Sequence, residues 1–267
     1  MPNMTFEQYI INPMGKNNSV LNSTAREAMR NVYTNKFHNV LLKENGKIDY
    51  FLYKDTKHNI YYAHIKVPSE VIKDFYYDTI IKFFADETVK ESGVNLEKYY
   101  VQFFSNDPAF VFTYTHAFVE NGLFIKELSS KMSQEALKKK AVEKNPNNDN
   151  GYVKSIYFAY LFLKERGLLK KVRWGEAQEF NLKLLLSNIT HADEKILARQ
   201  EEEEKRDKRK KVVVDKTTAR TIKKYGVSDT AKDRLVTTTS KVQTVKRTSA
   251  SNNIKKTKTT KVTKRKK

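Results

Sequence analysis

The sequence contains no cysteine, which excludes disulfide bonds, thiolate metal sites and a cysteine nucleophile. No apolar run approaches the roughly 18 residues that a membrane-spanning helix needs. Residues Met1–Asn12 have neither the basic segment nor the apolar segment of a secretory signal. We therefore expect a soluble protein that has no contact with a membrane and is made in a reducing cytoplasm.

Glycine is also scarce, with 8 residues in a chain of 267. None of the spacings GxGxxG, GxxxxGK[ST] and GxSxG occurs, so the common phosphate-binding loops and the nucleophile elbow of hydrolases are missing. We therefore expect a protein that is not an enzyme, with no catalytic residue, no metal ion and no cofactor.

One enzymatic alternative, a metal-dependent nuclease, stays open. Asp49 and Asp55 bracket one predicted strand, Glu70 follows the next, and Lys66 lies near them in the sequence. Carboxylates at strand ends, often with a lysine, are the residues that such a site needs. Scattered acidic residues of this kind occur in most proteins, so the pattern favours the non-enzymatic reading.

The 5 histidines show no pair at helical metal-binding spacing. His58 and His64 flank a predicted hairpin and are expected to be exposed residues of a sheet. His116 lies in a run of aromatic residues, where a hydrogen-bonded structural role is expected.

Acidic residues become rare towards the C-terminus. Residues 205–267 contain 23 Lys and Arg and only 4 Asp, a net charge of +19. The whole chain has 51 basic and 31 acidic residues, so residues 1–204 hold 28 and 27 of them, a net charge of +1. The charge therefore divides the chain into a nearly neutral part and a strongly cationic part.

Residues 205–267 contain no Phe or Trp and one aromatic residue, Tyr225. Such a segment buries too little apolar surface to offset its chain entropy, so we expect it to order only on binding. Polyanions suit it, because each neutralised phosphate releases counterions, and a single aromatic favours contact with the backbone over base stacking. The candidate polyanion-binding residues are Lys205, Arg206, Lys208, Arg209, Lys210, Lys211, Lys223, Lys224, Lys246, Arg247, Lys255, Lys256, Lys264, Arg265, Lys266 and Lys267.

Other readings of this segment remain open. It could be a solvated tail, or it could bind anionic lipid, RNA or an acidic protein surface. Lys205–Lys211 and Lys264–Lys267 also fit a nuclear localisation pattern, although such clusters arise freely in any basic tail.

The hydrophobic pattern predicts an α+β fold, with an antiparallel sheet of hairpins or a meander packed with several helices. We place this body in residues 1–190, a long charged helix in 191–211, and an extended basic arm in 212–267. The predicted helices of the body are 23–45, 69–86, 129–144 and a buried central one in 152–169. The predicted strands are 48–54, 59–67, 99–104, 109–119 and 123–125, while 1–22 is expected to be irregular and 180–186 is either helix or strand.

Tyr and Phe total 30 residues, and several stand next to each other in predicted strands, as in Tyr61–Tyr62 and Phe103–Phe104. Neighbouring strand residues point to opposite faces of a sheet. The pattern favours a sheet with helices on both faces. The alternative is an outward aromatic face that packs on another subunit.

Three stretches carry a family resemblance: Met4–Lys16 with its Asn12–Gly15 segment, Ser105–Phe110 continuing through Thr113–Thr115, and Gly151–Tyr160. Together they resemble uncharacterised proteins that tailed bacteriophages of low-GC hosts encode among their virion assembly genes. The resemblance covers roughly residues 1–190 and contains no catalytic motif. It implies a structural role near packaged DNA, at the capsid or at the head–tail connection.

Our first hypothesis is therefore a phage virion structural protein whose basic arm contacts DNA or neighbouring subunits. Its expected partners are other virion proteins, double-stranded DNA, or both, within a larger assembly that contains several copies of the chain. The second hypothesis is a free nucleic-acid-binding protein of replication or regulation. The third is an enzyme that acts on nucleic acid.

Overall fold

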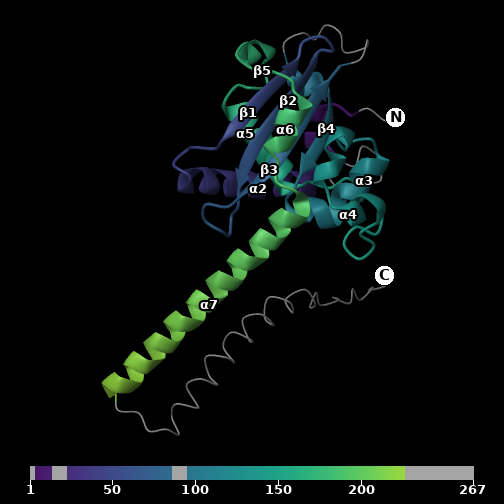
Figure 1. The fold of residues 1–267 in the computed structure, drawn as a ribbon. Helices are drawn as coiled ribbons and strands as arrows, with labels where there is room; N and C mark the ends of the chain where they lie inside the picture. Colours follow the sequence, from purple (N-terminus) through teal and green to yellow (C-terminus); the bar gives the residue numbers. More distant parts are fainter. Residues whose placement is uncertain (1–3, 14–22, 86–94, 226–267) are drawn as a thin grey trace, which may run out of the picture. The chain divides into compact units, whose positions relative to one another are not determined.

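In a computed structural model, residues 4–13, 23–85 and 95–225 are described, and for residues 209–225 only the backbone. The chain divides into two units, residues 1–204 and residues 205–267. The first unit has an α+β fold built on a five-stranded sheet (Figure 1). The α+β class expected from the sequence is confirmed.

The sheet has the strand order β4-β3-β2-β1-β5. Its strands are β1 (Tyr50–Asp55), β2 (Ile60–Pro68), β3 (Tyr76–Phe84), β4 (Tyr100–Ser105) and β5 (Gln178–Glu179). Strands β1 to β4 pair antiparallel, and β1 with β2 forms the predicted hairpin. The short strand β5 pairs parallel to β1, so the sheet is mixed and the expectation of an antiparallel sheet was incomplete.

Residues 69–85 do not form the predicted helix of 69–86, because β3 occupies Tyr76–Phe84. Ser69 does not begin a helix; its Oγ accepts hydrogen bonds from the backbone N–H groups of Val71 and Ile72 in a turn. Asp74 has a φ of 58°, and β3 begins two residues later. Strand β3 lies between β2 and β4, so the pairing of two neighbours outweighs the local helix signals.

Residues 109–119 are helical and not the strand predicted for them. Asp107 Oδ1 accepts a hydrogen bond from Ala109 N at 2.7 Å, and Pro108 stands at the first helical position, where its missing N–H costs nothing. A π-helical segment (Phe110–Tyr114) leads into α3 (Thr115–Glu120). The pattern of this segment was misleading because aromatic and β-branched residues fit a buried helix as well as a strand.

The predicted strands 109–119 and 123–125 do not form a hairpin either. Gly122, with a φ of 71°, follows the C-terminus of α3. Residues 123–125 then run parallel to β4, where Phe103 N donates to Leu123 O at 2.7 Å and Ile125 N donates to Phe103 O at 3.1 Å. The predicted three-stranded meander is therefore wrong, since only its first strand exists.

The other helices of the first unit agree with the predictions to different degrees. They are α1 (Phe6–Ile11), α2 (Ser23–Lys43), α4 (Gln134–Lys138), α5 (Lys154–Glu165) and α6 (Leu182–Ser187). Helix α1 lies in the segment expected to be irregular, where Thr5 and Gln8 form a capping box. Asn45 and Gly46, both with positive φ, follow α2 as its predicted end. Residues 129–144 contain only α4 and part of a 3-10 segment (Lys126–Lys131).

Helix α5 covers one face of the sheet and contacts β2, β3 and β4, while α2 packs against α5 (Figure 1). Every residue from Ser155 to Leu163 is buried, which confirms the predicted central helix. The chain from residue 180 to residue 196 covers the opposite face, where Phe180 stacks on Tyr62 with ring centroids 4.1 Å apart. Phe103 and Phe104 point to opposite faces and are both fully buried, so helical segments cover the sheet on both sides as favoured above.

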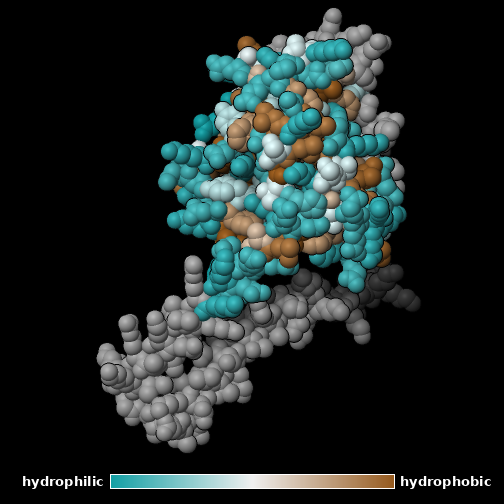
Figure 2. All heavy atoms as spheres, viewed as in Figure 1, coloured by the Kyte–Doolittle hydropathy of each residue, from teal (hydrophilic) through white to brown (hydrophobic). Residues whose placement is uncertain are grey.

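Figure 2 shows one face of the molecule, on which hydrophilic side chains surround small groups of hydrophobic ones. Among the residues that the structure describes, no helix has the length and apolar character to cross a membrane. Helix α7 (Ala192–Tyr225) begins in the first unit and continues past residue 211, where the arm was expected to start. Residues 226–267 of the predicted arm lie outside the described residues.

Candidate functional site

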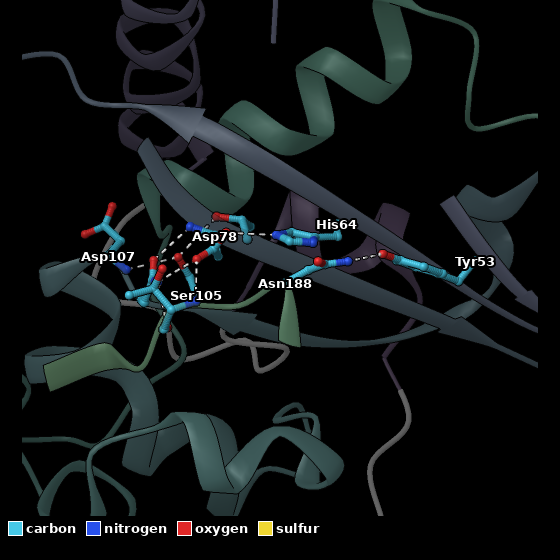
Figure 3. A network of polar contacts seen from close by, with 9 residues as sticks. Tyr53, His64, Asp78, Ser105, Asp107 and Asn188 are labelled. Atoms are coloured by element: carbon cyan, nitrogen blue, oxygen red, sulfur yellow. Dashed lines mark hydrogen bonds and ion pairs between the residues drawn. The ribbon is translucent and has the colours of Figure 1, made fainter. Parts of the chain in front are cut away.

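A polar network centred on Asp78 lies in the middle of the sheet, on the face that the chain leading into α7 covers (Figure 3). Asp78 belongs to β3 and is 4% exposed. Its Oδ1 accepts a hydrogen bond from His64 Nε2 at 2.9 Å. Its Oδ2 accepts from Asn106 Nδ2 at 3.0 Å and from the backbone N–H of Thr190 at 3.1 Å. The carboxylate therefore joins β2, β3, the end of β4 and the start of α7.

His64 is fully buried, so the expectation of an exposed sheet histidine was wrong. Strand β2 is covered on both faces, and His64 points to the same face as Asp78, with its ring 5.5 Å from that of Phe51. An ionised carboxylate only accepts hydrogen bonds, so Nε2 carries the proton that His64 shares with Asp78. Nδ1 is buried without a hydrogen-bond partner. The pair is thus a fixed acid–base contact inside the protein.

Asn106 follows β4 directly and is also fully buried. Its Oδ1 accepts from Asp78 N at 2.8 Å, and its Nδ2 donates both to Asp78 Oδ2 and to the backbone carbonyl of Thr190 at 3.1 Å. Asp78 and Asn106 therefore bind both backbone groups of Thr190. This arrangement satisfies the carboxylate and the amide with partners far apart in the sequence.

The charge of Asp78 is stabilised within this network. Burial acts to raise the pKa of Asp78, but the hydrogen bond and the charge of His64, the Thr190 N–H and the nearby Lys195 ammonium together hold that pKa below its ordinary value. Lys195 lies on the first turn of α7, with its Nζ 4.4 Å from the centre of the Phe75 ring. Burial lowers the pKa of Lys195, and the charge of Asp78 partly opposes this effect.

A second polar row lies on the opposite face of the sheet, beneath α5. The Oγ atom of Ser105 is 3.1 Å from Thr79 Oγ1 and 3.1 Å from Ser155 Oγ, and it accepts a hydrogen bond from Asp107 N. All three hydroxyl side chains are fully or almost fully buried. These hydroxyls bond one another, so the row connects α5 to the sheet as a structural contact.

The network around Asp78 contains an acid and a base, but neither reaches the surface. His64 is fully buried and Asp78 almost so, and their polar atoms bond to the protein itself. A substrate could contact them only if the chain around Thr190 moved away. Such a buried network, with its polar atoms bonded to the protein itself, holds segments of the fold together.

The predicted polyanion-binding residues are only partly described. Lys205, Arg206 and Lys208 are exposed residues of α7 in the second unit. Arg209, Lys210, Lys211, Lys223 and Lys224 lie in α7 with only their backbone described. Lys246, Arg247, Lys255, Lys256, Lys264, Arg265, Lys266 and Lys267 lie outside the described residues. Their proposed role therefore stays a prediction.

The acidic residues considered for a nuclease are not gathered in one place. Asp55 Oδ2 lies 2.7 Å from His58 Nδ1, which helps to lower the pKa of Asp55. Glu70 forms ion pairs with Lys154 at 3.0 Å and Lys36 at 3.5 Å. Within residues 4–13, 23–85 and 95–208, no three His, Asp or Glu side chains are grouped so that they could hold a metal ion.

The remaining two histidines discussed above have ordinary structural roles. His58 is exposed, as expected, at the end of the β1–β2 hairpin. His116 lies on α3 and not on a strand, and its Nδ1 is 3.2 Å from Asn148 Oδ1. The expected hydrogen-bonded role of His116 is confirmed, while its predicted secondary structure was wrong.

Sequence reasoning did not find the network of Asp78, Asn106 and Thr190. One signal was available, because Asp78 stands within a run of mostly aromatic and aliphatic residues, Tyr76–Phe84. A carboxylate in a buried strand needs hydrogen-bond partners. Comparison with protein-family models, with curated proteins and with solved structures yields no match to this chain.

Proposed function

We propose that this chain is a non-enzymatic structural protein of a tailed-phage particle, whose basic C-terminal segment contacts DNA or neighbouring subunits. The observation that carries the proposal is the charge division, +19 in residues 205–267 against +1 in residues 1–204. A segment of this charge gains free energy on any phosphate backbone by releasing counterions, without reading the sequence. Double-stranded DNA, with its high density of phosphate charge, is a partner that fits this chemistry.

The first unit supports a structural role by the way its polar groups are used. The buried acid and base, Asp78 and His64, bond to each other and hold the chain in place. The buried hydroxyls of Ser105 and Ser155 do the same on the other face of the sheet. These buried groups form their hydrogen bonds within the fold, which agrees with a structural role.

The phage setting comes from the resemblance of residues 1–190 to proteins of virion assembly modules. In that setting the body would bind other virion proteins, in several copies, at the capsid or at the head–tail connection. The basic segment would lie along packaged DNA or along an acidic groove of a neighbour. The resemblance is independent of the charge division, since it does not include residues 205–267.

DNA binding is tested by fluorescence anisotropy with a labelled DNA duplex over a range of salt concentrations. The full chain is compared with a variant that ends at Lys211, which lacks 17 basic and 3 acidic residues and so loses a net charge of +14. We expect the full chain to bind with an affinity that falls steeply with salt, by a slope of about 0.9 per contacted phosphate on logarithmic axes. The shortened variant should have a much smaller slope and weaker binding.

A matched control removes the same number of positive charges from the body as from the C-terminal segment. It tests whether the position of the charge matters for DNA binding. Lys264, Lys266 and Lys267 are replaced by serine in one variant, and Lys138, Lys139 and Lys140 of the body in another. Only the first should reduce the salt slope, by up to about 3 units, one for each lost phosphate contact. Equal effects of the two variants would contradict a specific role of the C-terminal segment.

The virion assignment is tested by mass spectrometry of purified phage particles. Stoichiometric presence of the chain supports it, and loss of the truncated variant from particles would connect the arm to assembly. A chain that binds duplex DNA but is absent from particles would instead be a free nucleic-acid-binding protein. Turnover of nucleic acid that needs a divalent ion and survives truncation would contradict the non-enzymatic role.

A further inference from the structure

The first turns of α7 are attached to the body by few apolar contacts. In residues 192–208, only Ala192 and Ile196 are buried. Lys195 lies over the Phe75 ring, and Arg199 bonds Glu203 within the same helix. We call residues 191–204 the α7 root. Two small or medium aliphatic side chains form a weak hydrophobic attachment for a helix of this length.

A polar attachment of the α7 root lies at Thr190, immediately before it. Asp78 Oδ2 accepts from Thr190 N, and Asn106 Nδ2 donates to Thr190 O, both at 3.1 Å. We call these three residues the clasp. A hydrogen bond to an ionised carboxylate is roughly twice as strong as one between neutral groups, so the clasp holds the chain firmly at Thr190.

The clasp can open without unfolding the sheet. Strand β3, which holds Asp78, pairs with β2 from Tyr76 to Phe83 and with β4 from Thr79 to Phe84. The chain before the clasp has its own attachment through the buried residues Leu185 and Ile189. Thr190 is itself exposed, so water can reach its backbone groups once the clasp has opened. We therefore expect that the α7 root can leave the body while the sheet stays folded.

We propose that the Asp78–Asn106–Thr190 clasp is a conformational device that controls whether the α7 root is docked on the body. When the clasp is closed, α7 continues from the body with a fixed first segment. When it is open, the chain turns about residues 189–191 and the root is released as one helical unit. The device concerns the body alone, so it does not depend on whether the basic segment binds DNA.

Asn106 is the better residue at which to test the clasp. In an Asp78→Asn variant, the new amide could keep its oxygen towards Thr190 and donate its N–H to His64, if the His64 proton moved from Nε2 to Nδ1. With this rearrangement, the Asp78→Asn variant would keep its hydrogen bonds to His64 and Thr190 and would not test the clasp. In Asn106→Asp, a second carboxylate faces Asp78 Oδ2 and the Thr190 carbonyl, and no such rearrangement removes the repulsion at neutral pH.

The groups that face the clasp define its response to acid. They are Asp78, the titratable His64 ring and Lys66 on β2, and Lys195 on α7. In Asn106→Asp the two carboxyl groups can share one proton, as adjacent carboxyls do. We therefore expect the variant to be open near neutral pH and to close again as the pH is lowered towards about 5.

The experiment is amide hydrogen exchange of the full chain, read by mass spectrometry on peptides of residues 190–204 and of β2 and β3. Asn106→Asp should speed exchange in residues 190–204 by roughly tenfold or more, equivalent to 1.4 kcal/mol or more, and leave β2 and β3 protected. Ser155→Ala is the matched control, because it removes a buried hydrogen bond to Ser105 on the opposite face. The control should leave exchange in residues 190–204 unchanged.

A second variant keeps the test valid if Asn106→Asp does not fold. Thr190→Pro removes the N–H that Asp78 accepts, at an exposed residue and without a change in the core. It should also release residues 190–204 while β2 and β3 stay protected. Unchanged exchange in both variants, or equal acceleration in β2, β3 and α7, would overturn the proposal.

Discussion

Replacement of Asp78 by alanine should strongly destabilise the first unit. The carboxylate is 4% exposed and accepts hydrogen bonds from His64, Asn106 and Thr190 at 2.9, 3.0 and 3.1 Å. Because Nδ1 of His64 is already without a partner, Asp78→Ala would leave a fully buried imidazole with no hydrogen bond at all. Asn106 would keep its bond to the Thr190 carbonyl.

The magnitude follows from the cost of orphaned buried groups. Removal of one partner from a buried, hydrogen-bonded charge pair costs about 3–5 kcal/mol, because the other partner stays desolvated. A domain of ordinary stability unfolds with about 5–15 kcal/mol. We therefore expect Asp78→Ala to lower the free energy of unfolding at pH 7 by about 3–5 kcal/mol, a large part of the total.

The same reasoning predicts the pH dependence. The pKa of Asp78 lies below its ordinary value in the folded protein, so the carboxylate contributes stability at every pH above its unfolded pKa of about 3.9. That contribution is lost as the pH falls through the lower pKa of the folded state. The difference between the wild-type protein and Asp78→Ala should therefore be constant near neutral pH and should shrink only in acid below about pH 4.

The measurement is urea denaturation followed by tryptophan fluorescence. The protein has 1 Trp, Trp174, which is 1% exposed and donates its indole N–H to Leu168 O at 2.7 Å, so its emission reports the core directly. Glu135→Gln serves as the control, because Glu135 forms an exposed ion pair with Lys139 that should contribute less than about 0.5 kcal/mol. A loss of under about 1 kcal/mol in Asp78→Ala at pH 7, comparable to the control, would refute the argument.

Two further substitutions test the packing around the helix that was mistaken for a strand. In Gly151→Ala the new Cβ would lie 2.3 Å from the Tyr114 ring, so we expect a loss of about 1–3 kcal/mol in thermal unfolding, whereas Gly175→Ala, with its nearest contact at 4.0 Å, should be close to neutral. Asp107→Ala removes the acceptor for Ala109 N and should cost about 1 kcal/mol in urea denaturation; a cost indistinguishable from zero would show that this cap is not needed.

Several elements could be predicted from the sequence because their signals are local. Helix α2 has apolar residues at helical spacing and ends at Asn45–Gly46, where both residues have positive φ. The β1–β2 hairpin has two aromatic-rich runs around a short polar turn. Helix α5 is apolar on all sides, which is the pattern of a buried helix.

The two large errors, β3 and residues 109–119, have a common cause. Both segments are rich in aromatic and β-branched residues, which fit a strand or a buried helix. In β3 the choice depends on backbone pairing with β2 and β4. In residues 109–119 it depends on the cap that Asp107 and Pro108 form.

The site could not be predicted because its residues are distant in the sequence. Asn106 is 28 residues from Asp78, and Thr190 is 112 residues from it. No local pattern places a backbone N–H beside a carboxylate over such a separation. The burial of His64 has the same origin, since it depends on the chain that covers its face of the sheet.

The sequence alone determined the division of charge and the mixture of helix and strand, because counts of residue types and local periodicity require no knowledge of distant contacts. Tertiary structure decided which aromatic run became the central strand and which became a helix. It also decided that Asp78, His64 and Asn106 meet at the start of α7. These outcomes depend on strand pairing and burial, which are set by partners that the chain brings together only on folding.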